Sequence, residues 1–185
     1  MEDYVYILDY LSMGKLGYRK ESIAYGIGED QFTLLELLPK RNVSLAIGER
    51  VYVGKDKEKR KKIAKVKGRV NYGELTAAAH GELPYVILDI VKNNEKKFVT
   101  FYNECPPIST RYHALELLPG LGKKTMYEIV EGRKKEPFKG FDNISARVKH
   151  LTHPEKLIAR RIEEELMDPG QKYRLFTRAP LKKIK

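Results

Sequence analysis

The segment from Leu117 to Thr125 carries the residues best suited to binding an anion. From position 118 it reads Leu-Pro-Gly-Leu-Gly-Lys-Lys-Thr. Pro119 ends any preceding helix, because proline cannot continue helical hydrogen bonding. Gly120 and Gly122 carry no Cβ, so the backbone can turn tightly and approach another surface closely. The pattern predicts a compact turn whose natural ligand is a phosphate.

The predicted chemistry follows from the helix that begins after this turn. Residues 123–130 are good helix formers with apolar side chains on one side, so a helix is expected to start near Gly122 or Lys123. The first amides of a helix have no partner within it, and the helix dipole adds positive potential there. The residues expected to hold a backbone phosphate are Gly120, Leu121, Gly122, Lys123, Lys124 and Thr125.

The turn resembles the helix-hairpin-helix module. That resemblance implies binding of nucleic-acid backbone phosphates through hairpin amides, without reading of base sequence. Upstream, Ser109 is expected to cap a helix that carries Ala114 and Leu118 on its apolar side. The alternative is a plain tight turn between two packed helices.

Apolar spacing predicts two further helices downstream of the turn. One contains Ile144 and Val148, and the other runs from about Leu157 to the stop signal at 168–170. The turn between them, at 152–155, lacks both glycines of the first turn. It resembles a degenerate second hairpin, which we expect to pack against the first one and not to bind phosphate.

Positive charge is concentrated in two segments of the chain. The 185 residues carry a formal net charge of +11. Residues 55–69 hold nine basic and two acidic residues, and residues 171–185 hold six basic and no acidic residues. Such concentration indicates a polyanionic partner. Nucleic acid is favoured over a membrane, since neither segment is a basic amphipathic helix or carries a lipidation signal. A solvated charged surface is the alternative.

The N-terminal part is predicted to be rich in strands. The predicted strands are 4–11, 23–27, 31–38, 48–54 and 63–72. So many short strands within about 70 residues favour a small barrel of the oligonucleotide-binding type. Lys65, Lys67 and Arg69 are expected to project together from the last strand, and the loop 55–62 extends this basic rim. The rim would track a phosphate backbone, with Tyr52 and Tyr72 as candidates for stacking on bases.

Residues 73–104 admit two interpretations. Apolar residues recur every four positions and favour helices, whereas residues 85–102 also fit a β-hairpin. The length of the segment and its alanine run favour two helices. Pro84 is then expected to start or kink one of them.

Enzymatic chemistry finds little support in the residues. Asp142 lies at the distance from the hairpin at which helix-hairpin-helix DNA glycosylases place a catalytic aspartate, but an N-cap role explains it. The four histidines show no metal-ligand spacing, and Glu163 to Glu165 are expected on the exposed side of the last helix. No Walker loop or Ser/His/Asp signature occurs. We therefore expect no catalytic residue, metal or cofactor.

Most of the chain resembles an uncharacterised archaeal family of predicted RNA-binding or nucleotide-binding proteins. The similarity lies in the strand 47–54, the segment Glu82-Leu83-Pro84-Tyr85-Val86-Ile87 and the 117–125 hairpin. It implies a barrel-like N-terminal domain and a C-terminal helix-hairpin-helix domain. The predicted fold is α+β: an OB-like barrel at 1–72, a helical connector at 73–104, a helix-hairpin-helix domain at 105–168 and a basic tail at 169–185.

The predicted function is non-catalytic nucleic-acid binding. The resemblance favours RNA over DNA, and the basic tail is expected to raise the rate of association. A protein-docking scaffold built on the helical part is the alternative, because hairpin modules also mediate protein contacts. The single cysteine, Cys105, fits a reducing compartment, and neither a signal peptide nor an apolar membrane span is recognised. We expect a cytoplasmic protein, and the sequence leaves its oligomeric state open.

Overall fold

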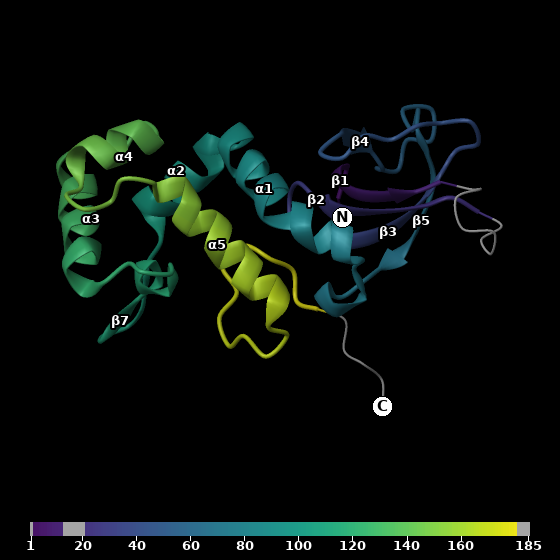
Figure 1. The fold of residues 1–185 in the computed structure, drawn as a ribbon. Helices are drawn as coiled ribbons and strands as arrows, with labels where there is room; N and C mark the ends of the chain where they lie inside the picture. Colours follow the sequence, from purple (N-terminus) through teal and green to yellow (C-terminus); the bar gives the residue numbers. More distant parts are fainter. Residues whose placement is uncertain (1, 13–20, 181–185) are drawn as a thin grey trace. The chain divides into compact units, whose positions relative to one another are not determined.

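Alternating apolar residues near the N-terminus form the strands of one antiparallel sheet (Figure 1). The computed structural model describes residues 2–12 and 21–180. The chain divides into two units, and the division falls within two helices. Unit 1 contains residues 1–86 and 164–185, and unit 2 contains residues 87–163.

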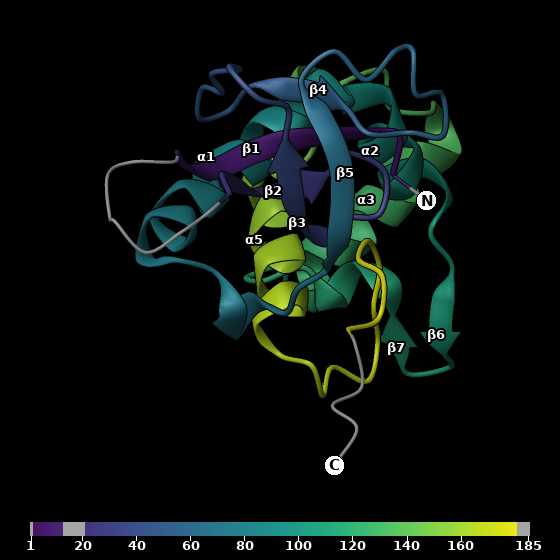
Figure 2. The same ribbon diagram turned by 90° about the vertical axis from the view of Figure 1, so that its right-hand side faces the viewer.

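The sheet of unit 1 curls into a half-barrel (Figure 2). Its strands are β1 (Tyr4–Leu11), β2 (Ile23–Gly28), β3 (Leu34–Pro39), β4 (Arg50–Tyr52) and β5 (Ile63–Arg69). Their order is β4-β1-β2-β3-β5, with every neighbouring pair antiparallel. The five predicted strands are thus confirmed, although β3, β4 and β5 are shorter than expected.

One face of the sheet packs a continuous apolar core. Its fully buried members include Val5 and Ile7 of β1, Leu37 of β3 and Ile63 of β5. Val5 and Ile7 are two residues apart and therefore lie on the same face of the strand. The opposite face of β1 is also covered, since Tyr6 and Leu8 are buried as well.

β3 begins three residues later than predicted because a buried carboxylate holds the preceding turn. Glu2 accepts hydrogen bonds from the backbone N–H groups of Asp30 (2.9 Å), Gln31 (3.0 Å) and Thr33 (3.1 Å). Phe32 between them is buried and has a φ of 51°. These contacts keep residues 30–33 out of the β-ladder.

The region 73–104 is helical, as the alanine run suggested. It contains a short 3₁₀ helix η1 (Tyr72–Glu74), α1 (Ala77–Asn93) and α2 (Glu95–Glu104). Pro84 lies inside α1. The alternative β-hairpin at 85–102 is therefore excluded.

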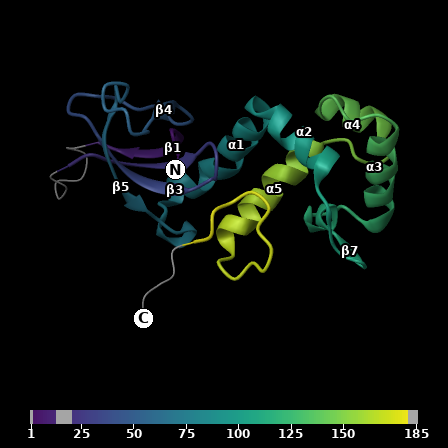
Figure 3. The same cartoon turned by 180° about the vertical axis from the view of Figure 1, so that it is seen from behind.

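Unit 2 continues with small elements and helices (Figure 3). They are β6 (Pro107–Ser109), β7 (Tyr112–His113), the 3₁₀ helix η2 (Ala114–Leu117), α3 (Lys123–Lys135), α4 (Phe141–Arg147) and α5 (Pro154–Met167), of which the end of α5 belongs to unit 1. The predicted helix capped by Ser109 is wrong. Ser109 lies in β6, and His113 caps η2 by accepting the N–H of Leu115 at Nδ1, 3.1 Å away.

Side chains with buried polar groups hold the helices of unit 2 together. The Tyr102 hydroxyl donates to the Pro154 carbonyl at 2.9 Å, which joins α2 to the start of α5. Asn103 exchanges two hydrogen bonds with the backbone of Phe138 (2.8 and 2.9 Å), which fixes the connection between α3 and α4. Arg147 donates to the carbonyls of Gly132 and Glu136 at the end of α3.

The C-terminal segment is anchored to unit 1 by a buried carboxylate. Glu165 is 0% exposed, which corrects the expectation that it faces solvent. It accepts hydrogen bonds from the amides of Leu175 (2.6 Å) and Thr177 (3.0 Å). Arg178 N–H also donates to the Gln31 carbonyl (3.0 Å). The described part of the predicted basic tail is therefore folded back and not free, and residues 181–185 lie outside the described residues.

Candidate nucleic-acid interface

The predicted turn before α3 is formed as the sequence indicates. α3 begins at Lys123, with Gly122 as its N-cap in extended conformation. Gly120 has a φ of +81°, a conformation that an L-residue with a Cβ adopts only at a cost. Leu121 is 5% exposed, so its side chain fixes the turn against the interior of unit 2.

Several backbone amides of this turn have no acceptor in the part of the chain that the structure describes. Within the described residues no hydrogen bond is recorded for the N–H groups of Gly122, Lys123, Lys124 and Thr125. Leu121 is the exception, since its amide donates to the Leu118 carbonyl at 3.1 Å. The expectation that Leu121 contributes a free amide is therefore wrong.

The space in front of the turn is open. A Cβ built on Gly120 or on Gly122 would meet no atom within 4 Å. The two glycines thus remove bulk from the surface itself and do not serve internal packing. A ligand can approach this backbone without a side chain in its path.

The second turn lies beside the first one and shares a hollow with it. This hollow of about 330 Å³ is lined by both turns and by α5. Its polar lining residues are Thr125, His150, Thr152, His153, Lys156 and Arg160. We expected the second turn only to pack, but it also brings polar side chains to the edge of the candidate site.

Four exposed cations belong to the helices that follow the two turns. Lys123 and Lys124 begin α3, while Lys156 and Arg160 are one turn apart on α5. No carboxylate partner is recorded for any of the four among residues 2–12 and 21–180. We call these four cations and the amides of residues 122–125 the hairpin face. It combines a helix N-terminus with unpaired positive charge, the arrangement that binds phosphate.

Sequence reasoning missed two members of the hairpin face and one exposed residue next to it. Lys156 and Arg160 belong to the turn and helix to which we assigned only packing. Tyr127, 61% exposed, follows Lys123 and Lys124 by four and three residues and so lies on the same side of α3. The (i, i+4) spacing of Lys156 and Arg160 is the signal that could have identified them.

The predicted basic row on β5 is divided by a β-bulge. The pairing shifts between Glu36 and Leu37, so Lys65 pairs with Leu38 whereas Arg69 pairs with the buried Leu35. Directly paired residues share a face, and Leu35 and Leu38 lie on opposite faces. The expectation that Lys65, Lys67 and Arg69 project together is therefore wrong for Arg69, whose guanidinium donates to the Ala179 carbonyl.

The remaining two lysines of the row differ in their surroundings. Lys67 forms an ion pair with Glu36 at 3.0 Å, and hydrogen bonding to this carboxylate raises the pKa of Lys67. Lys65 is exposed, and no partner for it is recorded in the described residues. Lys65 is therefore the member of the row best placed to meet an external phosphate.

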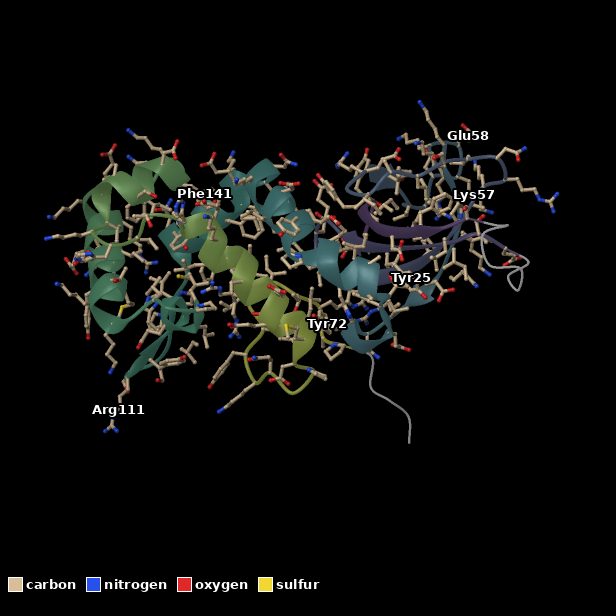
Figure 4. All side chains as sticks on the ribbon, viewed as in Figure 1. Tyr25, Lys57, Glu58, Tyr72, Arg111 and Phe141 are labelled. Carbon is tan, nitrogen blue, oxygen red and sulfur yellow. The ribbon has the colours of Figure 1, made fainter. Side chains whose placement is uncertain are left out.

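The loop between β4 and β5 carries exposed charges, including Lys57 and Glu58 (Figure 4). Part of its positive charge is already used within unit 1. The Lys62 ammonium pairs with Glu49, and Arg60 Nε donates to the Gly54 carbonyl at 2.6 Å. Lys55, Lys57 and Lys61 have no recorded partner in the described ranges. The basic rim is thus smaller than the sequence suggested.

The two tyrosines predicted to stack on bases pack within unit 1. Tyr52 contacts Tyr4 edge to face, with ring centroids 5.3 Å apart. Tyr72 stacks on His80, with ring centroids 4.4 Å apart. Each therefore already has an aromatic neighbour.

Asp142, the candidate for a catalytic aspartate, lies in the first turn of α4. Asp142 is the second residue of α4, whose N-cap is Gly140, so its predicted N-cap role is wrong. An acidic residue in the first turn is still stabilised by the helix dipole.

Among the described residues no three His, Cys, Asp or Glu side chains are grouped so as to hold a metal ion. The Cys105 thiol is buried, and burial raises its pKa.

The fold defines an α+β protein with a curled antiparallel sheet of five strands. Residues 1–178 match the family described as "Protein of unknown function (DUF655)", and the chain belongs to this family. It is 46% identical over 178 residues to the uncharacterized protein MJ0038 of Methanocaldococcus jannaschii, covering 96% of this chain and 80% of that protein.

A solved structure has a similar fold. The crystal structure of Af1531 from Archaeoglobus fulgidus, of the same family, matches with a TM-score of 0.87 and 46% sequence identity. The match covers 96% of this chain and 100% of that chain. The expectation of an uncharacterised family with archaeal members is confirmed. No helix in the described ranges is both long and apolar enough to cross a membrane.

Proposed function

We propose that the protein binds nucleic acid, preferentially RNA, through backbone phosphates at the hairpin face and without catalysis. The main observation is that, among residues 2–12 and 21–180, the amides of residues 122–125 have no acceptor and the four cations of the hairpin face have no carboxylate partner. Under this proposal, the turn is the binding element of a helix-hairpin-helix module. The curled sheet is an OB-like platform that adds contacts through Lys65 and the loop 55–62.

The chemistry of the hairpin face suits a phosphodiester. An anionic oxygen accepts from two or more of the free amides, while Lys123 and Lys124 add Coulomb attraction. Lys156 and Arg160 meet the neighbouring phosphate along the strand. Contacts of this kind position a backbone but do not distinguish bases. Tyr127 supplies an exposed ring on which an unpaired base can stack.

The test adds bulk to the hairpin without removing charge. In Gly122→Val the new side chain projects into open space, and the backbone there is already extended, so the fold is expected to tolerate it. It blocks the approach of phosphate to the amides. Loss of the charge-assisted hydrogen bonds predicts an affinity about tenfold lower or more for a short labelled single-stranded RNA.

The matched control is Gly81→Val, which also adds an isopropyl group where a Cβ meets nothing within 4 Å, on α1. It should bind RNA like the wild type. Equal losses in both variants, or no salt-dependent binding by the wild type, would contradict the proposal. DNA of the same sequence, measured in parallel, tests the preference for RNA.

A further inference from the structure

Unit 1 contains a second site of different character from the hairpin face. A cavity of about 500 Å³ lies between β3, the segment after β5, the end of α5 and the C-terminal segment. Leu34, Val70, Leu166 and Met167 give it an apolar wall. Its size and mixed lining are typical of a small-molecule site.

Three guanidinium groups line this cavity without a carboxylate partner. They belong to Arg69, Arg174 and Arg178. Arg174 donates to the carbonyls of Glu165 (2.6 Å) and Asp168 (2.8 Å), which are neutral acceptors. No ion pair is recorded for any of the three arginines within the part of the chain that the structure describes. Burial and the charge of Arg178 lower the pKa of Arg69, as expected where like charges gather.

The two acidic residues of the lining offset part of this charge, and their hydrogen bonds come from neutral donors. The carboxylate of Glu165 accepts the amides of the C-terminal segment and the Thr177 hydroxyl. Glu74 accepts the N–H of Asn71 at 2.7 Å. Each of the two carboxylates thus accepts hydrogen bonds from N–H or O–H groups of its own neighbourhood.

A buried hydroxyl at the same cavity also has no partner. Thr33 lines the cavity, is 7% exposed, and its Oγ1 forms no hydrogen bond in the structure. Buried hydroxyls are nearly always hydrogen-bonded, so an orphan one requires an explanation. This oxygen has less than 1 Å² of accessible surface, so a ligand in the cavity does not contact it in the present structure.

We propose that this cavity binds an anion of mononucleotide size, with its phosphate toward Arg69 and Arg178 and its ring against the apolar wall. The same chemistry has two sources: a free nucleoside monophosphate, or the phosphorylated terminal nucleotide of a strand. The site is separate from the hairpin face and does not depend on its function.

Isothermal titration calorimetry with AMP, adenosine and inorganic phosphate tests the chemistry. Wild type should bind AMP at least about tenfold more tightly than either fragment, because only AMP uses both the cations and the apolar wall. Arg178→Gln and Arg69→Gln should each weaken AMP binding about fivefold to tenfold. Arg111→Gln, an exposed arginine of unit 2, is the control and should have no effect.

A second arm separates the two sources of the ligand. A single-stranded RNA with a 5′ phosphate and the same strand with a 5′ hydroxyl are compared in Gly122→Val, which weakens the hairpin face. Tighter binding of the phosphorylated strand, abolished by Arg178→Gln, assigns the site to strand ends. The proposal is overturned if neither AMP nor the phosphorylated strand binds. It is equally overturned if adenosine binds as well as AMP, or if both cavity variants bind like the wild type.

Discussion

The salt dependence of RNA binding measures how many cations of the hairpin face neutralise phosphates. For a single-stranded RNA short enough to contact only the hairpin face, its four cations predict a slope of log K against log salt of about −2.8. Affinity should then fall about 50-fold between about 50 and 200 mM salt. Lys156→Ala/Arg160→Ala leaves two cations, so the slope becomes about −1.4 and the same change in salt lowers affinity about sevenfold.

Fluorescence anisotropy of a short labelled single-stranded RNA, titrated at several salt concentrations, gives both slopes. The matched control is Lys92→Ala/Lys96→Ala, which removes two exposed lysines of unit 2 that lie outside the hollow. Its slope should equal that of the wild type. An unchanged slope in Lys156→Ala/Arg160→Ala, or equal slopes in the two double variants, would refute the placement of phosphates on this face.

Three further predictions concern stability, measured by urea denaturation. Glu165→Ala should lower the free energy of unfolding by about 3 to 5 kcal/mol, because buried donors lose a charged acceptor, whereas Glu164→Ala should change it by less than about 0.5 kcal/mol. Gly120→Ala should lower it by about 1 to 2 kcal/mol because of the positive φ, while a similar loss in Gly122→Ala would contradict this cause. Burial, together with the charge of Arg133, lowers the pKa of His113 in the folded protein. As the pH falls, His113 is therefore protonated at a higher pH in the unfolded chain than in the folded protein. Wild-type stability should therefore decline as pH falls below about 6.5, and His113→Asn, which can still cap η2, should lose that component.

Local patterns in the sequence predicted most secondary structure. The alternation in residues 4–11 predicted β1, and the glycine turn followed by helix formers predicted a helix start near Gly122 or Lys123, where α3 begins. These predictions succeed because side-chain periodicity and glycine conformation are properties of a few consecutive residues. The wrong helix at 109–118 shows the limit of this logic. In this segment the chain forms the short 3₁₀ helix η2, which His113 caps, and not the longer helix that the weak apolar pattern predicted.

The candidate site was only partly visible in the sequence. Its amides and the two lysines of α3 follow from one continuous motif. Lys156 and Arg160 belong to the same face only because the second turn folds beside the first, more than thirty residues along the chain. The prediction for the basic row on β5 was wrong for a related reason. A bulge between β3 and β5 turns Arg69 to the other face of the sheet, and no pattern within β5 itself indicates this bulge.

The sequence by itself determined the strands, the helices that follow them, the excess of positive charge and the glycine turn with its exposed amides. Only the tertiary structure decided which cations of the described residues remain unpaired, that Glu165 is buried, and that three arginines line one cavity. The physical reason is that propensity and periodicity act between near neighbours. Burial and charge pairing, by contrast, depend on residues brought together from distant parts of the chain.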